Sequence, residues 1–484
     1  MPKEEAVKEI KGRNVTVVGL ARSGAGAANL LAGLGANVTV TDVKSEDDLR
    51  PYISILDPGV KRILGSHPDR LFSSADMIVV SPGVPLSIRP FDLARSESVP
   101  IISELELAYQ SATGFAYYSV PALVKEGFLA VTGTNGKSTT TALLDFMMKK
   151  GGFDTILGGN IGNALTEEID KLKADKKGRI VDWIVAEISS FQLEAIQDFR
   201  PKGSAILNLS PDHLDRYHSI EGYAAAKARI FENQGDDDFL VLNRDDPETL
   251  RLYETKLKAH DMKRPRVYFF SRRQEVEGVY LRDGQILCDI PSLPQIARRM
   301  SLLSAEEIRI KGIHNLENAM AASAMALLAG AAADAVRDSL LQFEGLEHRL
   351  EPVRELDGVR YINDSKGTNV GAVLKSLESF SSPVLLIAGG RDKAGEFALL
   401  RDLVKERVKA LILIGEAGEK IKKALGDVSR TIMAQSLKEA VEEARQLAQS
   451  GDVVLLSPAC ASFDMFRDFE DRGRQFKKIV MELK

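Results

Sequence analysis

Short apolar runs alternate with longer helix-like stretches along much of this chain. In the first segment, residues 14–19, 37–42 and 75–81 are Val-rich runs that end at small or acidic residues. Helix-like stretches separate them. Strands that alternate with helices in this way pair in parallel, because each helix carries the chain back across the sheet. The pattern predicts an open parallel α/β sheet at the start of the chain.

The same alternation continues through the rest of the sequence. Further strands are predicted at residues 183–187, 204–208, 239–243, 384–389, 410–415 and 453–457. Asp283 and Gly284 lie inside a charged section and predict a β-hairpin turn. We therefore expect an α/β protein of three domains, at residues 1–112, 113–344 and 345–484, with a linker at the start of the second.

A glycine-rich loop is the most informative local feature. Residues 131–140 read Val-Thr-Gly-Thr-Asn-Gly-Lys-Ser-Thr-Thr, between an apolar run and a helix-like run. A strand, glycine loop and helix in this order present backbone N–H groups and the positive helix end to phosphate. Lys137 can reach the outer phosphates, and the hydroxyl of Ser138 or Thr139 can hold Mg²⁺. The loop predicts ATP binding, although Val131 stands where the standard Walker pattern has glycine. The alternative is a glycine turn with a chance Gly-Lys-Ser.

Composition narrows the class of protein. The chain has 484 residues, of which 44% are hydrophobic and 27% charged, as in ordinary globular proteins of about three domains. A net charge of −5 argues against a nucleic-acid partner. The two cysteines, Cys288 and Cys460, are far apart, which argues against a disulfide framework or a zinc site and suits a reducing compartment.

No segment predicts export or membrane insertion. The first residues lack the apolar core of a secretory signal. The longest uncharged apolar run, residues 319–333, is shorter than the roughly 20 residues that a membrane helix needs. We interpret this run as a buried helix and expect a cytoplasmic protein with no membrane partner.

The first glycine turn leaves three interpretations open. Residues 19–26 resemble a dinucleotide fingerprint, but Ala21 stands where the middle glycine belongs. Asp42 ends the second strand, where an acid often meets a ribose hydroxyl. The turn could bind a dinucleotide, bind another nucleotide diphosphate, or simply connect a strand to a helix.

Several polar residues near the ATP loop are candidates for chemistry. Asn160 lies in a second glycine-rich loop and is a candidate substrate contact. Glu187 ends a strand, where a carboxylate can bind Mg²⁺ or cap a helix. His213 could bind metal, transfer protons, bind phosphate, or be structural. Lys227, taken alone, reads as a solvated helix lysine. Cys460 lacks a visible base and reads as a small buried residue.

Polar residues also gather after strand ends in the last part of the chain. Asn315 and Asn318 are three residues apart, so they share a helix face. Their side chains could form hydrogen bonds with the edge of a purine base, or they could cap a buried helix. Asp364, Lys366 and Thr368 place an acid, a cation and a hydroxyl together.

Taken together, these motifs resemble those of the Mur ligase family, the ATP-dependent amide ligases of peptidoglycan assembly. The resemblance covers nearly the whole chain, and the motifs occur in the family's order. Motifs that mark the superfamily are at residues 133–138 and 314–318. Motifs typical of the member that adds D-glutamate are at residues 158–162, 187–194, 212–216, 363–369 and 457–464.

The resemblance implies both a fold and a reaction. The fold would have a Rossmann-like N-terminal domain, a central ATPase-like domain with a parallel sheet, and a Rossmann-like C-terminal domain. The reaction would add D-glutamate to UDP-N-acetylmuramoyl-L-alanine through an acyl phosphate, with ATP and two Mg²⁺ ions, and release ADP and phosphate. We expect a monomer that uses small-molecule substrates only.

The resemblance also implies roles for matched positions. The UDP-linked substrate would be bound by Ser23, Asp42, Lys44, Ser81, Gly83 and Asn160. ATP would be bound by Gly133, Thr134, Asn135, Gly136, Lys137, Ser138, Thr139, Asn315, Asn318, Arg349 and Asp364. D-glutamate would be bound by Lys366, Thr368, Lys393, Ser462 and Phe469. Catalytic roles would fall on Lys137, Glu187, His213 and Lys227, and metal-binding roles on Ser138, Glu187, His213 and Lys227.

Lys227 matches a family lysine that is carbamylated by CO₂, and the resemblance implies the same modification here. The physical logic agrees, because a neutral lysine amine reacts with CO₂ to give an anion that can bind Mg²⁺.

The chain departs from the family pattern in a few places. Lys44 stands where arginine is common. Lysine cannot make the bidentate contact with phosphate that arginine makes. Phe463 stands where leucine is common. The segments 113–126 and 250–310 are lengthened. None of these departures touches the ATP chemistry, so they bear on UDP affinity and on the shape of the D-glutamate pocket.

Three other functions compete with this one. Another ligase of the same family would add a different amino acid, or glutamate to folate; the run 457–464 favours D-glutamate. A dinucleotide-dependent oxidoreductase is disfavoured by Ala21 and by the ATP loop. A nucleotide-binding regulator without catalysis is disfavoured by the polar residues at the strand ends.

Overall fold

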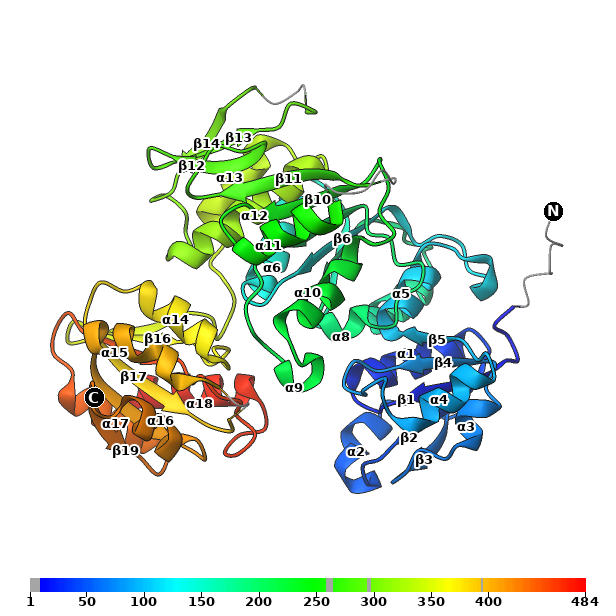
Figure 1. Ribbon diagram of the computed structural model, residues 1–484, viewed down its shortest axis with the longest axis horizontal. Coiled ribbons are helices and arrows are strands. Elements are labelled where there is room, and N and C mark those ends of the chain that lie inside the picture. Colours follow the sequence, from blue (N-terminus) through cyan, green and yellow to red (C-terminus); the bar gives the residue numbers. More distant parts are fainter. Residues whose placement is uncertain (1–8, 258–263, 294–296, 393–394) are drawn as a thin grey trace. The chain divides into compact units, whose positions relative to one another are not determined.

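The strands that the structure describes form three sheets, one after another along the chain (Figure 1). The computed structural model describes residues 9–257, 264–293, 297–392 and 395–484. The chain divides into two compact units: residues 1–306 with 318–339, and residues 307–317 with 340–484. The first unit holds two of the sheets and the second unit holds the third.

The N-terminal sheet has five parallel strands in the order β3-β2-β1-β4-β5. Its elements are β1 (Asn14–Val18), α1 (Arg22–Gly33), β2 (Asn37–Asp42), α2 (Glu46–Ile53), β3 (Lys61–Leu64), α3 (Arg70–Ser73), β4 (Met77–Val80), α4 (Arg89–Ser96), β5 (Ile101–Ser103) and α5 (Glu104–Ala112). The strands predicted at 14–19, 37–42 and 75–81 are confirmed. Their apolar side chains are buried on both faces, as parallel sheets require.

The central sheet has nine strands in the order β14-β13-β12-β11-β10-β9-β6-β8-β7. Its strands are β6 (Val124–Thr132), β7 (Thr155–Gly159), β8 (Val181–Glu187), β9 (Gly203–Ile206), β10 (Phe239–Asn243), β11 (Arg266–Ser271), β12 (Gly278–Arg282), β13 (Gln285–Asp289) and β14 (Met300–Ser304). Its helical segments are η1 (Ala116–Tyr118), α6 (Lys137–Lys150), α7 (Leu165–Lys173), α8 (Ser190–Leu193), α9 (Leu214–Tyr217), α10 (Ile220–Ala228), η2 (Arg229–Phe231), α11 (Pro247–Leu252), η3 (Tyr253–Leu257), α12 (Ile313–Leu328) and α13 (Ala333–Gln342).

The lengthened section near residues 250–310 adds an antiparallel edge to this sheet. β12, β13 and β14 pair antiparallel, whereas β6 to β11 pair in parallel. The predicted hairpin turn is confirmed: Asp283 and Gly284 connect β12 to β13 with φ angles of 51° and 75°. Two consecutive positive φ angles match the twist of a tight hairpin.

The second unit contains a six-stranded sheet in the order β15-β16-β20-β17-β18-β19. Only the β15–β16 pair is antiparallel. Its elements are β15 (Glu351–Leu356), β16 (Val359–Asn363), α14 (Val370–Glu378), β17 (Val384–Gly389), η4 (Phe397–Leu400), α15 (Arg401–Arg407), β18 (Val408–Ile414), α16 (Gly418–Leu425), β19 (Arg430–Met433), α17 (Leu437–Leu447), β20 (Val453–Leu456) and α18 (Phe469–Glu482).

Residues 319–327 of the apolar run 319–333 are buried in α12, as predicted, but Gly330 and Ala332 are exposed and the run ends at the start of a second helix. α12 ends at Leu328 and α13 begins at Ala333. Gly330 lies between them with φ of 97°, a left-handed conformation that suits a turn after a helix. Among the described residues, no helix combines the length and apolar character needed to cross a membrane.

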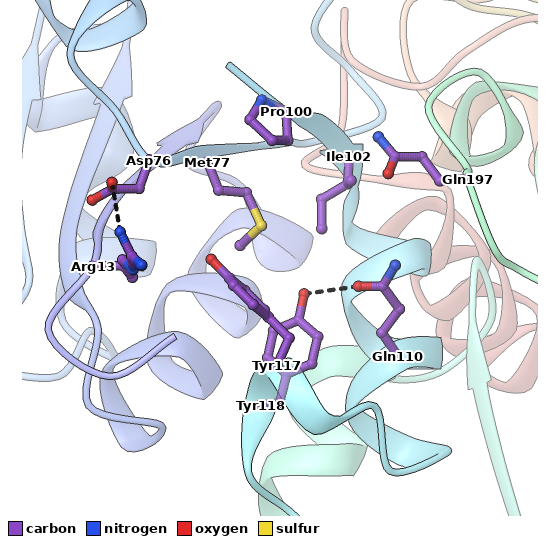
Figure 2. Close-up of a pocket in the computed structure, with 9 residues that line it drawn as sticks. All are labelled: Arg13, Asp76, Met77, Pro100, Ile102, Gln110, Tyr117, Tyr118 and Gln197. Atoms are coloured by element: carbon purple, nitrogen blue, oxygen red, sulfur yellow. Dashed lines mark hydrogen bonds and ion pairs between the residues drawn. The ribbon is translucent and has the colours of Figure 1, made fainter. Parts of the chain in front are cut away.

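The lengthened linker packs against the N-terminal domain. β6 already begins at Val124, so the linker is shorter than the predicted 113–126. The linker side chains Tyr117 and Tyr118 line a pocket of about 310 Å³ with Met77 and Gln110 (Figure 2). Tyr118 is 2% exposed, and its hydroxyl donates a hydrogen bond of 3.0 Å to Oε1 of Gln110.

Two buried glutamates in α5 join the N-terminal and central domains. Glu106 accepts hydrogen bonds from the backbone N–H groups of Gln197, Asp198 and Phe199, at 2.8 to 3.0 Å. Glu104 accepts from the backbone N–H and the hydroxyl of Thr166, at 3.0 and 2.9 Å. Burial raises the pKa of Glu106, and the three N–H donors act in the opposite direction. These bonds fix the two domains of the first unit to each other.

We predict that Glu106→Gln destabilises the first unit by about 3 kcal/mol, because an amide NH₂ would face backbone N–H donors that need an acceptor. Chemical denaturation of the purified protein measures this change. Glu97→Gln is the matched control, because Glu97 is exposed at the end of α4. Equal stability of Glu106→Gln and Glu97→Gln would show that the hydrogen bonds of Glu106 do not hold the two domains together.

Candidate functional site

The predicted ATP loop connects the end of β6 to the start of α6. Gly133 and Gly136 have φ angles of 148° and 84°, in the region that favours glycine. A Cβ atom on Gly136 would lie 2.2 Å from Oδ1 of Asn318. Asn318 also accepts a hydrogen bond of 3.2 Å from the hydroxyl of Thr140. The structure therefore brings together Asn318 and the loop, two features that the sequence separates widely.

A residue that the sequence analysis missed holds the loop in shape. The side chain of Asn208, just after β9, accepts from the backbone N–H of Asn135 at 2.8 Å and donates to its carbonyl at 3.0 Å. The backbone N–H of Thr134 donates to the carbonyl of Asn208 at 2.9 Å. The side chain of Asn208 therefore pairs with the N–H and the carbonyl of Asn135 much as a neighbouring strand would, and this pairing holds Asn135 in one orientation.

The first turn of α6 carries the predicted phosphate ligands. Nζ of Lys137 donates to the carbonyls of Gly133 and Thr134 at 3.0 and 2.8 Å, so its ammonium lies over the loop. Ser138 and Thr139 are each 5% exposed at the N-terminal end of the helix. The positive helix end and the cationic amine both favour an anion here.

Lys227 is buried in α10, which contradicts the interpretation of a solvated helix lysine. It is 1% exposed, and its Nζ donates to the hydroxyl of Thr132 at 3.3 Å and lies 4.7 Å from the ring centre of Tyr223. Burial first, and the positive charge of Lys137 second, lower the pKa of Lys227 well below its ordinary value. The negative charges of Asp212 and Glu187 act in the opposite direction but are smaller effects. The amine is therefore much easier to deprotonate than an exposed lysine.

Glu187 lies at the carboxyl end of β8, next to the end of β6. It is 1% exposed, and its Oε1 accepts a hydrogen bond of 2.7 Å from Nδ2 of Asn160. The backbone N–H of Asn160 donates to the carbonyl of Glu187 at 2.8 Å. The two predicted residues meet because β7 and β8 are parallel neighbours that end at the same edge.

His213 begins the short helix α9 in a left-handed conformation, with φ of 53°. Its ring lies 4.7 Å from the ring of Phe191 and 6.4 Å from that of Tyr223. A non-glycine residue in this conformation is a feature of functional loops more often than of regular structure. Tyr223 contacts both His213 and Lys227, so these two predicted catalytic residues share one neighbour.

Oxygen donors that could hold a hard cation such as Mg²⁺ lie near the glycine-rich loop. In the described part of the chain, no three His, Cys, Asp or Glu side chains gather in a metal-binding group. Glu187 and the Ser138 hydroxyl offer oxygen ligands near the phosphate loop. Mg²⁺ is usually held by one or two carboxylates, with waters and substrate phosphates as the other ligands.

A pocket of about 390 Å³ lies between the N-terminal and central domains of the first unit. All six residues predicted to bind the UDP-linked substrate line it: Ser23, Asp42, Lys44, Ser81, Gly83 and Asn160. The carboxylate of Asp42 accepts hydrogen bonds from the backbone N–H groups of Leu20 and Lys44, at 2.7 and 2.9 Å. Arg22, His67 and Gln192 also line the pocket, and the sequence analysis missed them. The pocket is in the size range of small-molecule sites.

The second unit contains the remaining predicted residues. Asp364 is buried, and its Oδ2 accepts hydrogen bonds of 2.6 Å from the hydroxyls of both Ser376 and Ser457. Burial raises the pKa of this carboxyl. Nδ2 of Asn315 donates to the carbonyl of Lys311 at 2.8 Å. The predicted contacts of Asn315, Arg349 and Asp364 with the nucleoside stay predictions.

Lys366 and Phe469 contact each other in this unit. Nζ of Lys366 lies 3.6 Å from the ring centre of Phe469. Thr368 and Ser462 follow β16 and β20, which are parallel neighbours. Lys393 lies outside the described residues. Phe463 is 63% exposed, so this departure from the family pattern leaves the core unchanged.

Arg472 was missed, although it joins the two loops that carry these residues. It is fully buried in α18 and donates to the hydroxyl and carbonyl of Ser365, at 2.9 and 2.8 Å, and to the carbonyl of Cys460 at 3.3 Å. One signal was available, because Arg472 occupies the same helix face as the buried Phe476 and Val480.

Three family models match the chain in order. A Mur ligase MurD-like N-terminal domain matches residues 13–103, a Mur ligase middle domain matches 131–326, and a Mur ligase glutamate ligase domain matches 348–460.

Similar proteins match over nearly the full length. A UDP-N-acetylmuramoylalanine–D-glutamate ligase of Geotalea daltonii is 46% identical over 477 residues, which is 98% of each chain. A ligase of the same name from Pelotomaculum thermopropionicum is 44% identical over 99% of each chain. Among solved structures, a UDP-N-acetylmuramate–alanine ligase of Thermotoga maritima has a TM-score of 0.58 at 19% identity, covering 98% of this chain and all of the other. A MurF ligase of Thermotoga maritima in complex with ADP has a TM-score of 0.59 at 16% identity, covering 92% and 95%.

We predict that Gly136→Ala deforms the phosphate loop and weakens binding of Mg-ATP about tenfold or more, because the new methyl group would overlap Asn318. Titration with a fluorescent ATP analogue measures the affinity. Gly152→Ala is the matched control: Gly152 has φ of 86°, but a Cβ there meets no atom within 4 Å. Ala at Gly152 carries comparable backbone strain but lies outside the loop and meets no atom, so equal affinity in both variants would refute the role of the Asn318 contact.

Proposed function

The chain belongs to the Mur ligase family, and from this membership we propose that it adds D-glutamate to UDP-N-acetylmuramoyl-L-alanine with cleavage of ATP to ADP and phosphate. The observation that carries the proposal is 46% identity over 98% of the chain to a relative that bears this activity in its name. The grouping of Lys137, Glu187 and Lys227 beside a pocket lined by Asn160 supports it.

The pocket between the N-terminal and central domains is the proposed site for the UDP-linked substrate. Its lining gives apolar surface for a base and polar groups for the ribose and phosphates, as nucleotide sites require. Lys44 and Arg22 are cations in its lining. Asn160 lies at the end of the pocket and contacts Glu187, so it connects the substrate site to the residues around the ATP loop.

The first chemical step joins the acceptor carboxylate to phosphate. An oxygen of the carboxylate attacks the γ-phosphorus of ATP, the bond from that phosphorus to the bridging oxygen breaks, and ADP leaves. The product is an acyl phosphate. Lys137, at the N-terminal end of α6, would stabilise the negative charge on the transferred group.

In the second step, the amine of D-glutamate attacks the acyl carbon. A tetrahedral intermediate forms, phosphate leaves with the former carboxylate oxygen, and the attacking nitrogen loses one proton to give the amide. Lys366, Thr368, Ser462 and Phe469 of the second unit are proposed to bind D-glutamate. Because acyl phosphates hydrolyse, binding must exclude water from the reacting carbon.

Glu187, His213 and the Ser138 hydroxyl would hold the Mg²⁺ ions, with Lys227 as a further ligand once carbamylated. When bound, Mg²⁺ neutralises phosphate charge. Asn160 would orient Glu187 through its hydrogen bond, and Tyr223 lies near both His213 and Lys227.

Carbamylation of Lys227 has a direct physical basis in its burial. The neutral amine attacks the carbon of CO₂, a C–N bond forms, and a proton leaves, which gives a carbamate anion. Because burial lowers the pKa of Lys227, the neutral amine is populated at a lower pH than in an exposed lysine. The anion would replace a buried cation beside Lys137 by a favourable charge pair.

Phosphate release by the purified protein tests the proposed function. With Mg-ATP, we expect release only when UDP-N-acetylmuramoyl-L-alanine and D-glutamate are both present. Lys137→Ala should lower the rate at least about 100-fold, because one charge that stabilises the transferred group is lost. Lys150→Ala, at the exposed far end of α6, is the control and should keep the rate. Release that depends on another amino acid would reassign the substrate.

The carbamate predicts a distinct spectroscopic signal. Protein equilibrated with ¹³C-bicarbonate should show a carbamate carbon resonance that is absent from Lys227→Ala and retained in the exposed-lysine variant Lys171→Ala. Lys227→Ala should also lose most activity, with partial recovery on addition of short carboxylic acids that can replace the anion. A Lys227→Ala enzyme with the wild-type rate would disprove the carbamate.

A further inference from the structure

Arg216 contacts the rim of the proposed UDP pocket from the opposite domain. Its Nη1 donates to the carbonyl of Pro82 at 3.2 Å, and its Nη2 donates to the carbonyl of Val84 at 3.3 Å. These carbonyls lie on either side of Gly83, which lines the pocket. Arg216 itself belongs to α9 of the central domain, and neither its motif nor the proposed mechanism gives it a role.

Contacts within the central domain also fix the guanidinium of Arg216. Nη2 also donates to Oε2 of Glu194 at 2.5 Å, and the guanidinium carbon lies 4.4 Å from the ring centre of Phe191. Tyr217 donates to Oε1 of the same glutamate at 2.6 Å. Side-chain exposure is 17% for Arg216 and 16% for Glu194, so solvent screens this pair little.

The backbone around Arg216 needs such anchoring. α9 has four residues and lies between His213 and His218, whose φ angles are 53° and 61°. Left-handed conformations are unfavourable for non-glycine residues and persist only when surrounding contacts determine them. Arg216 and Tyr217 provide these contacts through Glu194, so the same interactions hold His213 and the pocket rim.

The turn that Arg216 contacts also touches the opposite wall of the pocket. The hydroxyl of Ser81 donates to the carbonyl of Gly19 at 2.8 Å. A Cβ on Gly19 would lie 2.7 Å from a methyl group of Val84. Because the two turns are in close contact, a shift of residues 82–84 changes the width of the pocket.

We propose that Arg216 is a positioning residue for the UDP-linked substrate: it holds the turn 82–84 against the central domain and so sets the shape of the pocket. The inference rests on the proposed function of that pocket. Arginine is required because two backbone carbonyls, a carboxylate and a ring face must be satisfied together. A planar guanidinium spreads its N–H groups in a fork and presents a face to the ring, whereas the three N–H groups of a lysine ammonium radiate from one atom without such a face.

The test is Arg216→Lys, which keeps the charge and loses the double carbonyl contact. We expect KM for UDP-N-acetylmuramoyl-L-alanine to rise about tenfold or more, with kcat at saturation and KM for ATP and D-glutamate within about twofold of wild type. Calorimetric titration with UDP alone should show the same loss of affinity. Equal KM and equal UDP affinity in the variant would overturn the inference, and so would a uniform loss in kcat and every KM.

Arg337→Lys is the matched control. Arg337 also donates to two backbone carbonyls, those of Leu302 and Ser301, and pairs with Asp334, all within the central domain and away from Glu194. It should leave KM for the UDP substrate unchanged. If Arg216→Lys does not fold, Glu194→Gln tests the inference instead. This variant weakens the ion pair that anchors Arg216 and should raise KM for UDP-N-acetylmuramoyl-L-alanine about threefold. A wild-type protein that neither binds UDP nor releases phosphate would refute the proposed function, and the inference with it; a wild-type protein that does both isolates the inference.

Discussion

The central constraint in this protein is the enclosure of a lysine amine at the carboxyl edge of a parallel sheet. Lys227 is 1% exposed, within the electrostatic influence of a second cation, Lys137. An isolated buried ammonium is strongly unfavourable, so such an amine must lose its proton, gain a negative partner, or react. The proposed carbamylation would do the last of these and would convert the unfavourable charge into an anion beside Lys137. The surrounding residues, from Thr132 to Tyr223, keep the amine enclosed.

Several other predicted site residues follow strands that end at the same edge of the central sheet as this amine. β6, β8 and β9 are adjacent and parallel, so the phosphate loop, Glu187 and Asn208 emerge at one edge. β7 adds Asn160 at the same edge, and Asn160 reaches the pocket between the two domains of the first unit. Glu106 and Arg216 then fix these two domains to each other at separate points. In our interpretation, the reacting end of the substrate can be positioned because the pocket proposed for its UDP end belongs to the same compact unit.

Much of this fold and part of the site could be predicted from sequence. The alternating runs predicted inner strands of all three sheets but none of the edge strands β3, β5, β7, β14, β15 and β19. Asp283-Gly284 predicted its hairpin, because such signals act over a few neighbouring residues. The linker was predicted too long, because β6 extends back to Val124. Asn208, Arg216 and Arg472 were missed as structural contacts. Each makes its hydrogen bonds to residues far away in sequence, and a polar side chain after a strand or on a helix gives no sign of its partner.

By itself, the sequence determined the three α/β domains, the position of the phosphate loop and the family. These follow from local periodicity, from glycines with required conformations, and from motifs whose residues are contiguous. Only the tertiary structure decided that Lys227 is buried, that Asn160 contacts Glu187, and that Arg216 reaches the pocket rim. Burial and long-range contact depend on which elements pack together. The charge state of a lysine or the role of an arginine is therefore a property of the folded chain and cannot be derived from its neighbours in sequence.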